Sequence, residues 1–120
     1  MPKRLASTIE QVHALAWAGK HQKAIELATQ ELDNPNLLVS LRMDLLNLRS
    51  ESYIAIGKLD LALQDANTMM KISSKLNVAG LRAQALNRLA LVQMRTGELK
   101  AASKSAANAL KTAQQSKQKP

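Results

Sequence analysis

The chain has 120 residues, a formal net charge of +8 and no cysteine. Disulfide bonds and thiolate metal sites are therefore excluded, and the length suits a single hydrophobic core. Trp17 and Tyr53 are the only aromatic residues. Strands favour aromatic and β-branched side chains, so a core made mainly of Ala, Leu, Met, Ile and Val predicts an all-α protein.

The N-terminal segment and the hydropathy bear on the location of the protein. No run of 18 apolar residues occurs, so we expect no membrane-spanning helix. Lys3 and Arg4 lie near the start, but Glu10, Gln11 and His13 interrupt any apolar region after them. This pattern argues against a signal peptide, and we expect a cytoplasmic protein.

Apolar residues recur at spacings of three and four along six stretches, which is the helical periodicity. The predicted helices span residues 5–18, 21–32, 37–56, 59–73, 78–96 and 99–114. Glycines follow the first, third and fifth helices, where they allow a left-handed turn. A loose connection is expected near residues 74–77. Residues 115–120 contain no apolar side chain, and we expect them to form a frayed tail.

One pattern of small residues occurs three times, with a glycine, alanines five and nine residues later, and a large apolar residue four beyond. The copies are Gly19-Ala24-Ala28-Leu32, Gly57-Ala62-Ala66-Met70 and Gly97-Ala102-Ala106-Leu110. The glycines lie 38 and 40 residues apart, and such a period is typical of stacked supersecondary units. Residues i and i+4 share a helix face, so each alanine pair forms a smooth stripe that lets a neighbouring helix approach closely. Chance is the alternative, because alanine is the best helix former, but the repeated glycine offset weighs against it.

The repeat predicts one domain of three antiparallel helical hairpins that stack side by side. The units are about residues 5–34, 37–74 and 78–114. A helical bundle around a shared axis, without a groove, is the alternative arrangement.

The segments 50–59 and 85–99 resemble the tetratricopeptide repeat most closely. The family's small residue, seven positions before the glycine, falls on Ser50 and Ala90 and less well on Val12. The alanine of the family's second helix is kept in all three units, at Ala24, Ala62 and Ala102. The resemblance covers about residues 5–114 and is specific for the fold but weak for function.

The sequence departs from the family pattern at its bulky positions. Thr8, Leu46 and Leu86 stand where the family has a tryptophan, and alanines replace the aromatic residue of the second helix. The period also exceeds the usual length of about 34 residues. The repeat of this chain is similar to the longer repeats of kinesin light chains and of bacterial signalling regulators.

The resemblance implies a short right-handed superhelix, an α-solenoid, in which the first helices line a concave groove and the second helices cover its back. The groove residues are then Ile9, Glu10, His13, Ala16, Trp17, Asp44, Asn47, Leu48, Glu51, Ile54, Gln84, Asn87, Arg88, Leu91 and Arg95. The groove changes from mixed and acidic at one end to basic at the other, where Arg88 and Arg95 are the foremost binding candidates. A protein or peptide with an acidic group and a hydrophobic anchor would suit it. Ordinary solvated helix faces are the alternative interpretation.

The second half of the chain is strongly basic. Residues 1–70 contain seven Lys or Arg and eight Asp or Glu, whereas residues 71–120 contain ten and one. Lys100, Lys104 and Lys111 fall within about 40° of one another on the last helix. This basic face favours an acidic partner. Nucleic acid is the alternative ligand, although this half has no aromatic residue on which single-stranded bases could stack.

Catalytic and metal chemistry find little support in the sequence. His13 and His21 lie eight residues apart, and neither forms an i,i+4 ligand pair with Glu10 or Glu26. No glycine-rich phosphate loop occurs. We expect a non-enzymatic interaction scaffold without a cofactor or a metal ion, and His21 as a packed residue.

The last predicted helix is apolar on the face that would lie at the outer end of the stack. Terminal units of a stack normally present a polar outer face. The last helix instead presents Leu99, Ala102, Ala106, Ala109, Leu110 and Ala113. Either this face packs only on residues 78–96, or it is covered by further repeats of a longer chain or by a second copy of this one. We expect that the chain is a segment of a larger repeat protein or a self-associating unit.

Overall fold

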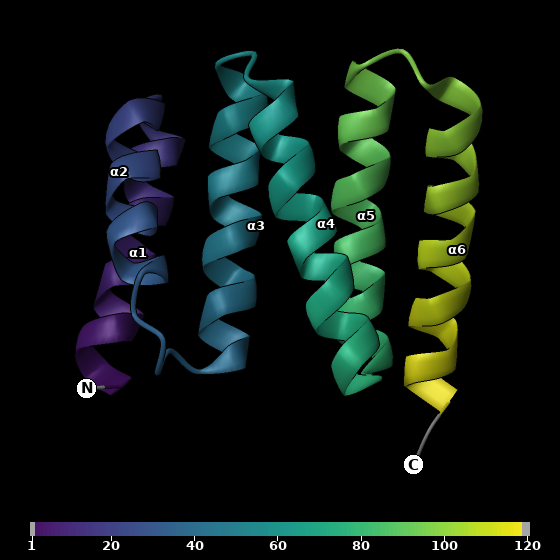
Figure 1. Cartoon of the computed structure of the whole chain (residues 1–120), viewed down its shortest axis with the longest axis horizontal. Helices are drawn as coiled ribbons and strands as arrows, with labels where there is room; N and C mark the ends of the chain where they lie inside the picture. Colours follow the sequence, from purple (N-terminus) through teal and green to yellow (C-terminus); the bar gives the residue numbers. More distant parts are fainter. Residues whose placement is uncertain (1, 119–120) are drawn as a thin grey trace.

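The computed structural model describes residues 2–118, and it describes the side chains of residues 8–115. In this range the chain forms six α-helices and no strand (Figure 1). They are α1 (Pro2–Trp17), α2 (His21–Leu32), α3 (Val39–Ala55), α4 (Leu59–Leu76), α5 (Ala79–Arg95) and α6 (Leu99–Gln118). The prediction of an all-α protein is confirmed, and none of these helices is long and apolar enough to cross a bilayer.

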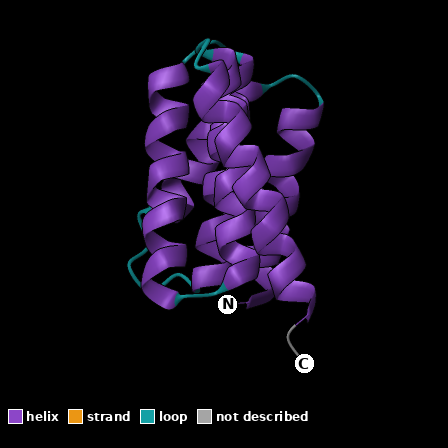
Figure 2. Cartoon of the chain, turned by 90° about the vertical axis from the view of Figure 1, so that its right-hand side faces the viewer, coloured by secondary structure: helices purple, strands orange, loops and turns teal. Residues whose placement is uncertain are grey.

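The helices lie in a row, and each one packs against the next along the chain (Figure 1). Helix α3 also contacts α1 on one side and α5 on the other. Within the described part of the chain, α2 has no such contact with α4, and α4 has none with α6. The odd-numbered helices therefore lie closer to one another than the even-numbered helices do. Figure 2 views the row from the α6 end.

The three predicted glycine turns are confirmed, and all have the same geometry. Gly19, Gly57 and Gly97 have φ angles of +80°, +77° and +86°, which only glycine adopts without strain. In each turn the residue after the glycine donates its backbone N–H to the carbonyl five positions earlier, over 2.8 Å. This bond satisfies a carbonyl that the helix end would leave unpaired.

Helix α3 begins at Val39, two residues later than the sequence predicts. The chain first makes a tight turn, in which the backbone N–H of Asn36 donates to Asn34 Oδ1 over 3.0 Å. Leu37 then turns inward and is buried in the core. Arg42 binds back across the turn by donating to the Leu32 carbonyl over 3.0 Å. These contacts hold residues 37–38 outside the helix.

Helix α4 continues to Leu76, through the segment that the sequence analysis assigned to a loose connection. Ser73 does not break the helix, because its hydroxyl donates to the Met70 carbonyl over 3.0 Å. The helix ends at Asn77, which has a φ of 55° and takes the left-handed conformation that glycine supplies elsewhere.

Helix α6 runs to Gln118, so it includes residues 115–118 of the expected frayed tail. No glycine or proline occurs in this segment to end the helix. Residues 119–120 lie outside the described range.

Alanine stripes form the centre of the core. Ala24, Ala28, Ala62 and Ala66 have no exposed surface. The first pair lies in one cluster with Leu45 of α3, so this stripe packs against α3.

A partly buried ion pair and its hydrogen bonds join three helices beside the second stripe. Arg49 of α3 donates to both carboxylate oxygens of Asp65 of α4, over 2.9 and 2.6 Å. Its third nitrogen donates to Thr29 Oγ1 of α2 over 3.0 Å, and the guanidinium lies 5.6 Å from the ring centre of Tyr53. The hydrogen bond to the Asp65 carboxylate raises the pKa of Arg49, and burial offsets this in part. This network fixes how α2, α3 and α4 are spaced.

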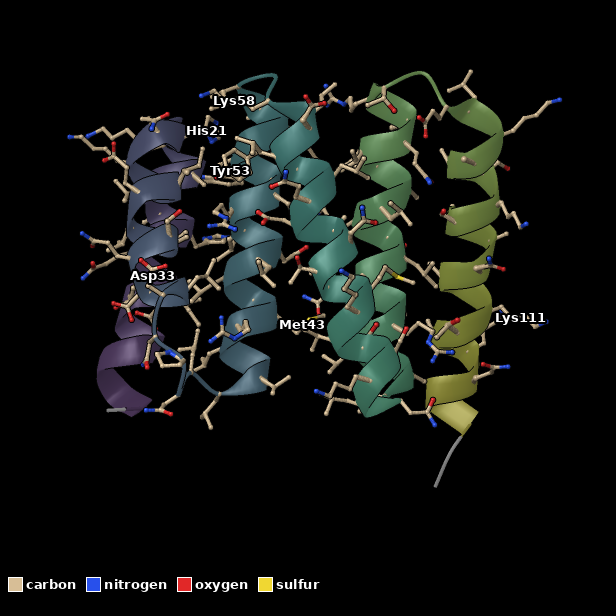
Figure 3. All side chains as sticks on the ribbon, viewed as in Figure 1. His21, Asp33, Met43, Tyr53, Lys58 and Lys111 are labelled. Atoms are coloured by element: carbon tan, nitrogen blue, oxygen red, sulfur yellow. The ribbon has the colours of Figure 1, made fainter. Side chains whose placement is uncertain are left out.

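His21 begins α2 beside α3, at the same end of the molecule as Tyr53 (Figure 3). Its Nδ1 forms a hydrogen bond with Ser52 Oγ over 3.1 Å, and the ring is half-buried. The prediction that His21 is a packed residue is confirmed.

Candidate functional site

Two hollows of about 370 Å³ each lie along the side of the row on which the odd-numbered helices face solvent. The first lies between α1 and α3, and its lining residues are Ile9, Glu10, His13, Asp44, Asn47 and Leu48. The second lies between α3 and α5, and its lining residues are Glu51, Ile54, Ala55, Arg88, Leu91 and Arg95. Most of the predicted groove residues therefore lie in one or other of these hollows.

Arg88 connects the two hollows. Its Nε donates to Asn47 Oδ1 over 3.0 Å, and its Nη2 lies 3.7 Å from Glu51 Oε2. The Arg88 side chain is only 12% exposed. Burial lowers the pKa of Arg88, and the carboxylate of Glu51 offsets this in part. Arg88 therefore joins α3 to α5 and has little surface left for a partner.

Arg95 is the more accessible of the two arginines that the sequence singles out. It lies at the end of α5, is exposed, and lines the second hollow. No salt bridge to a described residue engages it. An acidic group bound in the second hollow would meet Arg95 first.

Asp44 gives the first hollow a different electrostatic character. Partial burial raises the pKa of Asp44 above its ordinary value of 3.8, and a hydrogen bond with Gln84 lowers it in part. Glu10 and His13 share the hollow. The α1–α3 end is therefore acidic at neutral pH, and the α3–α5 end contains the arginines.

Four predicted groove residues line neither hollow, namely Ala16, Trp17, Gln84 and Asn87. Trp17 is at the end of α1 with 87% of its surface exposed. Asn87 is exposed on α5 but lines neither hollow. Gln84 reaches the site only through its hydrogen bond with Asp44. Helical periodicity indicates which face of a helix a side chain lies on, but it does not indicate how far a hollow extends along that helix.

The alternative basic face lies on α6. Lys100, Lys104 and Lys111 are exposed, and Lys111 points outward from α6 on the side away from α5 (Figure 3). The sequence of α6 contains no acidic residue. These three lysines are therefore not neutralised by carboxylates of their own helix.

Sequence reasoning missed the pairing of Arg88 with Asn47 and that of Arg49 with Asp65. A signal for the second pair existed, because Asp65 directly precedes Ala66 of the alanine stripe. A charged residue at the edge of a buried stripe needs a partner. Within the described part of the chain, no cluster of three or more His, Cys, Asp or Glu side chains could hold a metal ion.

Comparison of the chain with family models, with characterised proteins and with solved structures finds no significant match.

Proposed function

We propose that the protein is a helical-repeat scaffold, similar to tetratricopeptide repeat domains, that binds a peptide or protein segment along the side formed by α1, α3 and α5. The observation that carries this proposal is the alignment of two hollows on that side, one on each flank of α3. Each hollow combines apolar and charged residues, as peptide-binding sites commonly do. The chain would thus act by binding and not by catalysis.

The spacing of the helices supports a curved stack. The odd-numbered helices contact one another in sequence, whereas the described even-numbered helices do not. A row whose members are closer on one side bends toward that side. The side with α1, α3 and α5 is then concave, and a concave surface buries more of an extended ligand than a flat one does.

The charges of the two hollows suggest the orientation of a ligand. Glu10 and Asp44 line the first hollow, and Arg95 lies exposed in the second beside Ile54 and Leu91. A segment with an acidic residue next to an apolar anchor fits the second hollow. Electrostatic complementarity of this kind fixes the register of a ligand more than it increases affinity.

Selection of peptides from a random displayed library on the purified chain tests the proposal. We expect selected peptides to contain acidic and apolar residues and to lose at least tenfold in affinity on Arg95→Glu. Lys104→Glu is the matched control, because it reverses the same charge at an exposed α6 position outside both hollows. Arg88→Glu is unsuitable, since it would also break the contact between α3 and α5. Peptides that bind both variants equally would contradict the proposal.

A nucleic-acid-binding domain is the second candidate, and the exposed lysines on α6 favour it. Retention on heparin or DNA would then fall steeply as salt increases, because each phosphate contact releases counterions. The triple variant Lys100→Glu, Lys104→Glu and Lys111→Glu would lose that retention and leave peptide binding unchanged.

A further inference from the structure

The outer face of the last hairpin is open where the same face of the earlier hairpins is covered. In the first hairpin, Ala24 and Ala28 of α2 are fully buried in a cluster with Leu45 of α3. In the second, Ala62 of α4 is fully buried in a cluster with Val92 of α5. Each of these alanine stripes is thus covered by the first helix of the following unit.

The third stripe lies on α6, and no helix follows it in residues 2–118. A hollow of about 440 Å³ lies here between α5 and α6, and Met94, Leu99, Ala102 and Ala106 line it. Met94 and Leu99 are 51% and 65% exposed, whereas Ile54, which matches Met94 in the second unit, is 8% exposed. The hollow therefore corresponds to the place that α3 takes on the first hairpin and α5 on the second.

The two helices around this hollow contain basic residues and no acidic residue. Two copies of such a surface repel each other when they meet face to face. Glu98 is the only acidic residue after residue 70, so α5 and α6 supply no carboxylate to balance these cations. No charged residue lines the hollow itself, but the exposed cations Arg95, Lys100 and Lys104 each directly follow a lining residue in the chain. These flanking cations favour an acidic occupant over a second α5–α6 face.

Helix α1 of another copy is also a poor occupant. Where α3 has Leu41 and Leu45, the matching positions relative to the glycine in α1 are Lys3 and Ser7. Leu45 is the residue that packs on the first alanine stripe. A head-to-tail stack of copies would therefore lack the apolar contacts that join the units inside the chain.

We propose that the hollow between α5 and α6 is a docking site for an amphipathic helix of a partner protein, with an apolar face flanked by acidic residues. Its apolar face would cover the Ala102–Ala106 stripe, and its carboxylates would face the cations of α5 and α6. This surface is additional to the groove of α1, α3 and α5. Leu91 borders both the 440 Å³ hollow and the second groove hollow, so the test is placed on α6.

A synthetic helical peptide tests this site with the full chain. The peptide is based on α3. It keeps Leu41, Leu45 and Leu48 at their native spacing, to form the apolar face, and has Glu at the positions that face solvent. The control peptide carries Lys at those positions. Calorimetric titration is expected to give saturable binding of the acidic peptide and at least tenfold weaker binding of the basic one.

Variants of two adjacent alanines locate the binding surface. Ala106→Arg places a large side chain in the hollow and is expected to weaken binding of the acidic peptide at least tenfold. Ala107→Arg adds the same charge at a neighbouring exposed position that does not line the hollow, and it should change affinity less than twofold. Both alanines are exposed, so circular dichroism should find both variants as helical as the parent chain.

Three results would overturn the proposal. The first is the absence of saturable binding by the acidic peptide. The second is binding that survives Ala106→Arg, which would place the peptide on another surface. The third is a dimer in sedimentation experiments that Ala106→Arg converts to a monomer, since the occupant would then be a second copy.

Discussion

The region from α2 to α4 and the α5–α6 hairpin are built differently, although both follow the same glycine and alanine pattern. The first contains a three-helix polar network around Arg49 and two fully buried alanine stripes. In the second, the side-chain hydrogen bond between the helices is that of Ser105 to Gln93, over 2.8 Å. Its alanine stripe is partly open, since Ala102 is buried and Ala106 is exposed. A repeated pattern thus specifies the hairpin, and the neighbouring unit decides whether its outer face is core or surface.

Removal of the buried carboxylate should produce the largest difference between the two regions. Asp65→Ala leaves Arg49 without its partner, and we expect the unfolding free energy to fall by about 3 kcal/mol. Asp60→Ala, at an exposed position in the first turn of α4, is the charge-matched control. It should cost less than about 1 kcal/mol, through the helix dipole. Urea denaturation measures both, and equal losses would show that the ion pair does not hold the helices together.

Enlargement of matched alanines should separate the covered stripe from the open one. Ala66 has no exposed surface, so Ala66→Leu should overpack the core and cost about 1–3 kcal/mol. Ala106 occupies the same position in the last unit but is exposed, and Ala106→Leu should change stability by less than about 0.5 kcal/mol. The shift in the urea midpoint measures the difference. If Ala106→Leu cost as much as Ala66→Leu, the last stripe would be covered in solution.

The first groove hollow should produce the smallest effect, a pH dependence centred on Asp44. Because partial burial raises the pKa of Asp44, the folded state holds its proton more tightly than the unfolded state does. The contribution of this group to stability is therefore greatest at low pH and is lost as pH rises through the raised pKa. Asp44→Asn should melt slightly higher than the parent chain at pH 7, and this difference should vanish below pH 3.8. A pH-independent difference in thermal melts would contradict this assignment.

The helices and turns could be predicted from the sequence because both depend on local chemistry. Periodic apolar residues define the helices, and Gly19, Gly57 and Gly97 take the left-handed conformation that the pattern requires. The errors lie at the boundaries: Ser73 bonds back to its own helix instead of ending it, and Leu37 turns into the core before α3 begins.

The lining of the groove hollows could be predicted only in part. Helical projection puts Glu10, His13 and Asp44 on one side of the row, and the structure places them in one hollow. The same projection gave Arg88 as a foremost binding candidate, whereas Asn47 and Glu51 of the neighbouring helix engage it. Asn47 and Arg88 are 41 residues apart in the chain, so no local pattern encodes their pairing.

Mapping of a library-selected peptide by nuclear magnetic resonance on the isotope-labelled chain tests the groove proposal most directly. We expect the amide signals of α1, α3 and α5 to shift on titration, with the largest changes near His13, Asn47 and Arg95. The signals of α2 and α4 should change least. Shifts concentrated on α2 and α4, or spread evenly over all six helices, would contradict the proposal that the inner side of the row is the binding surface.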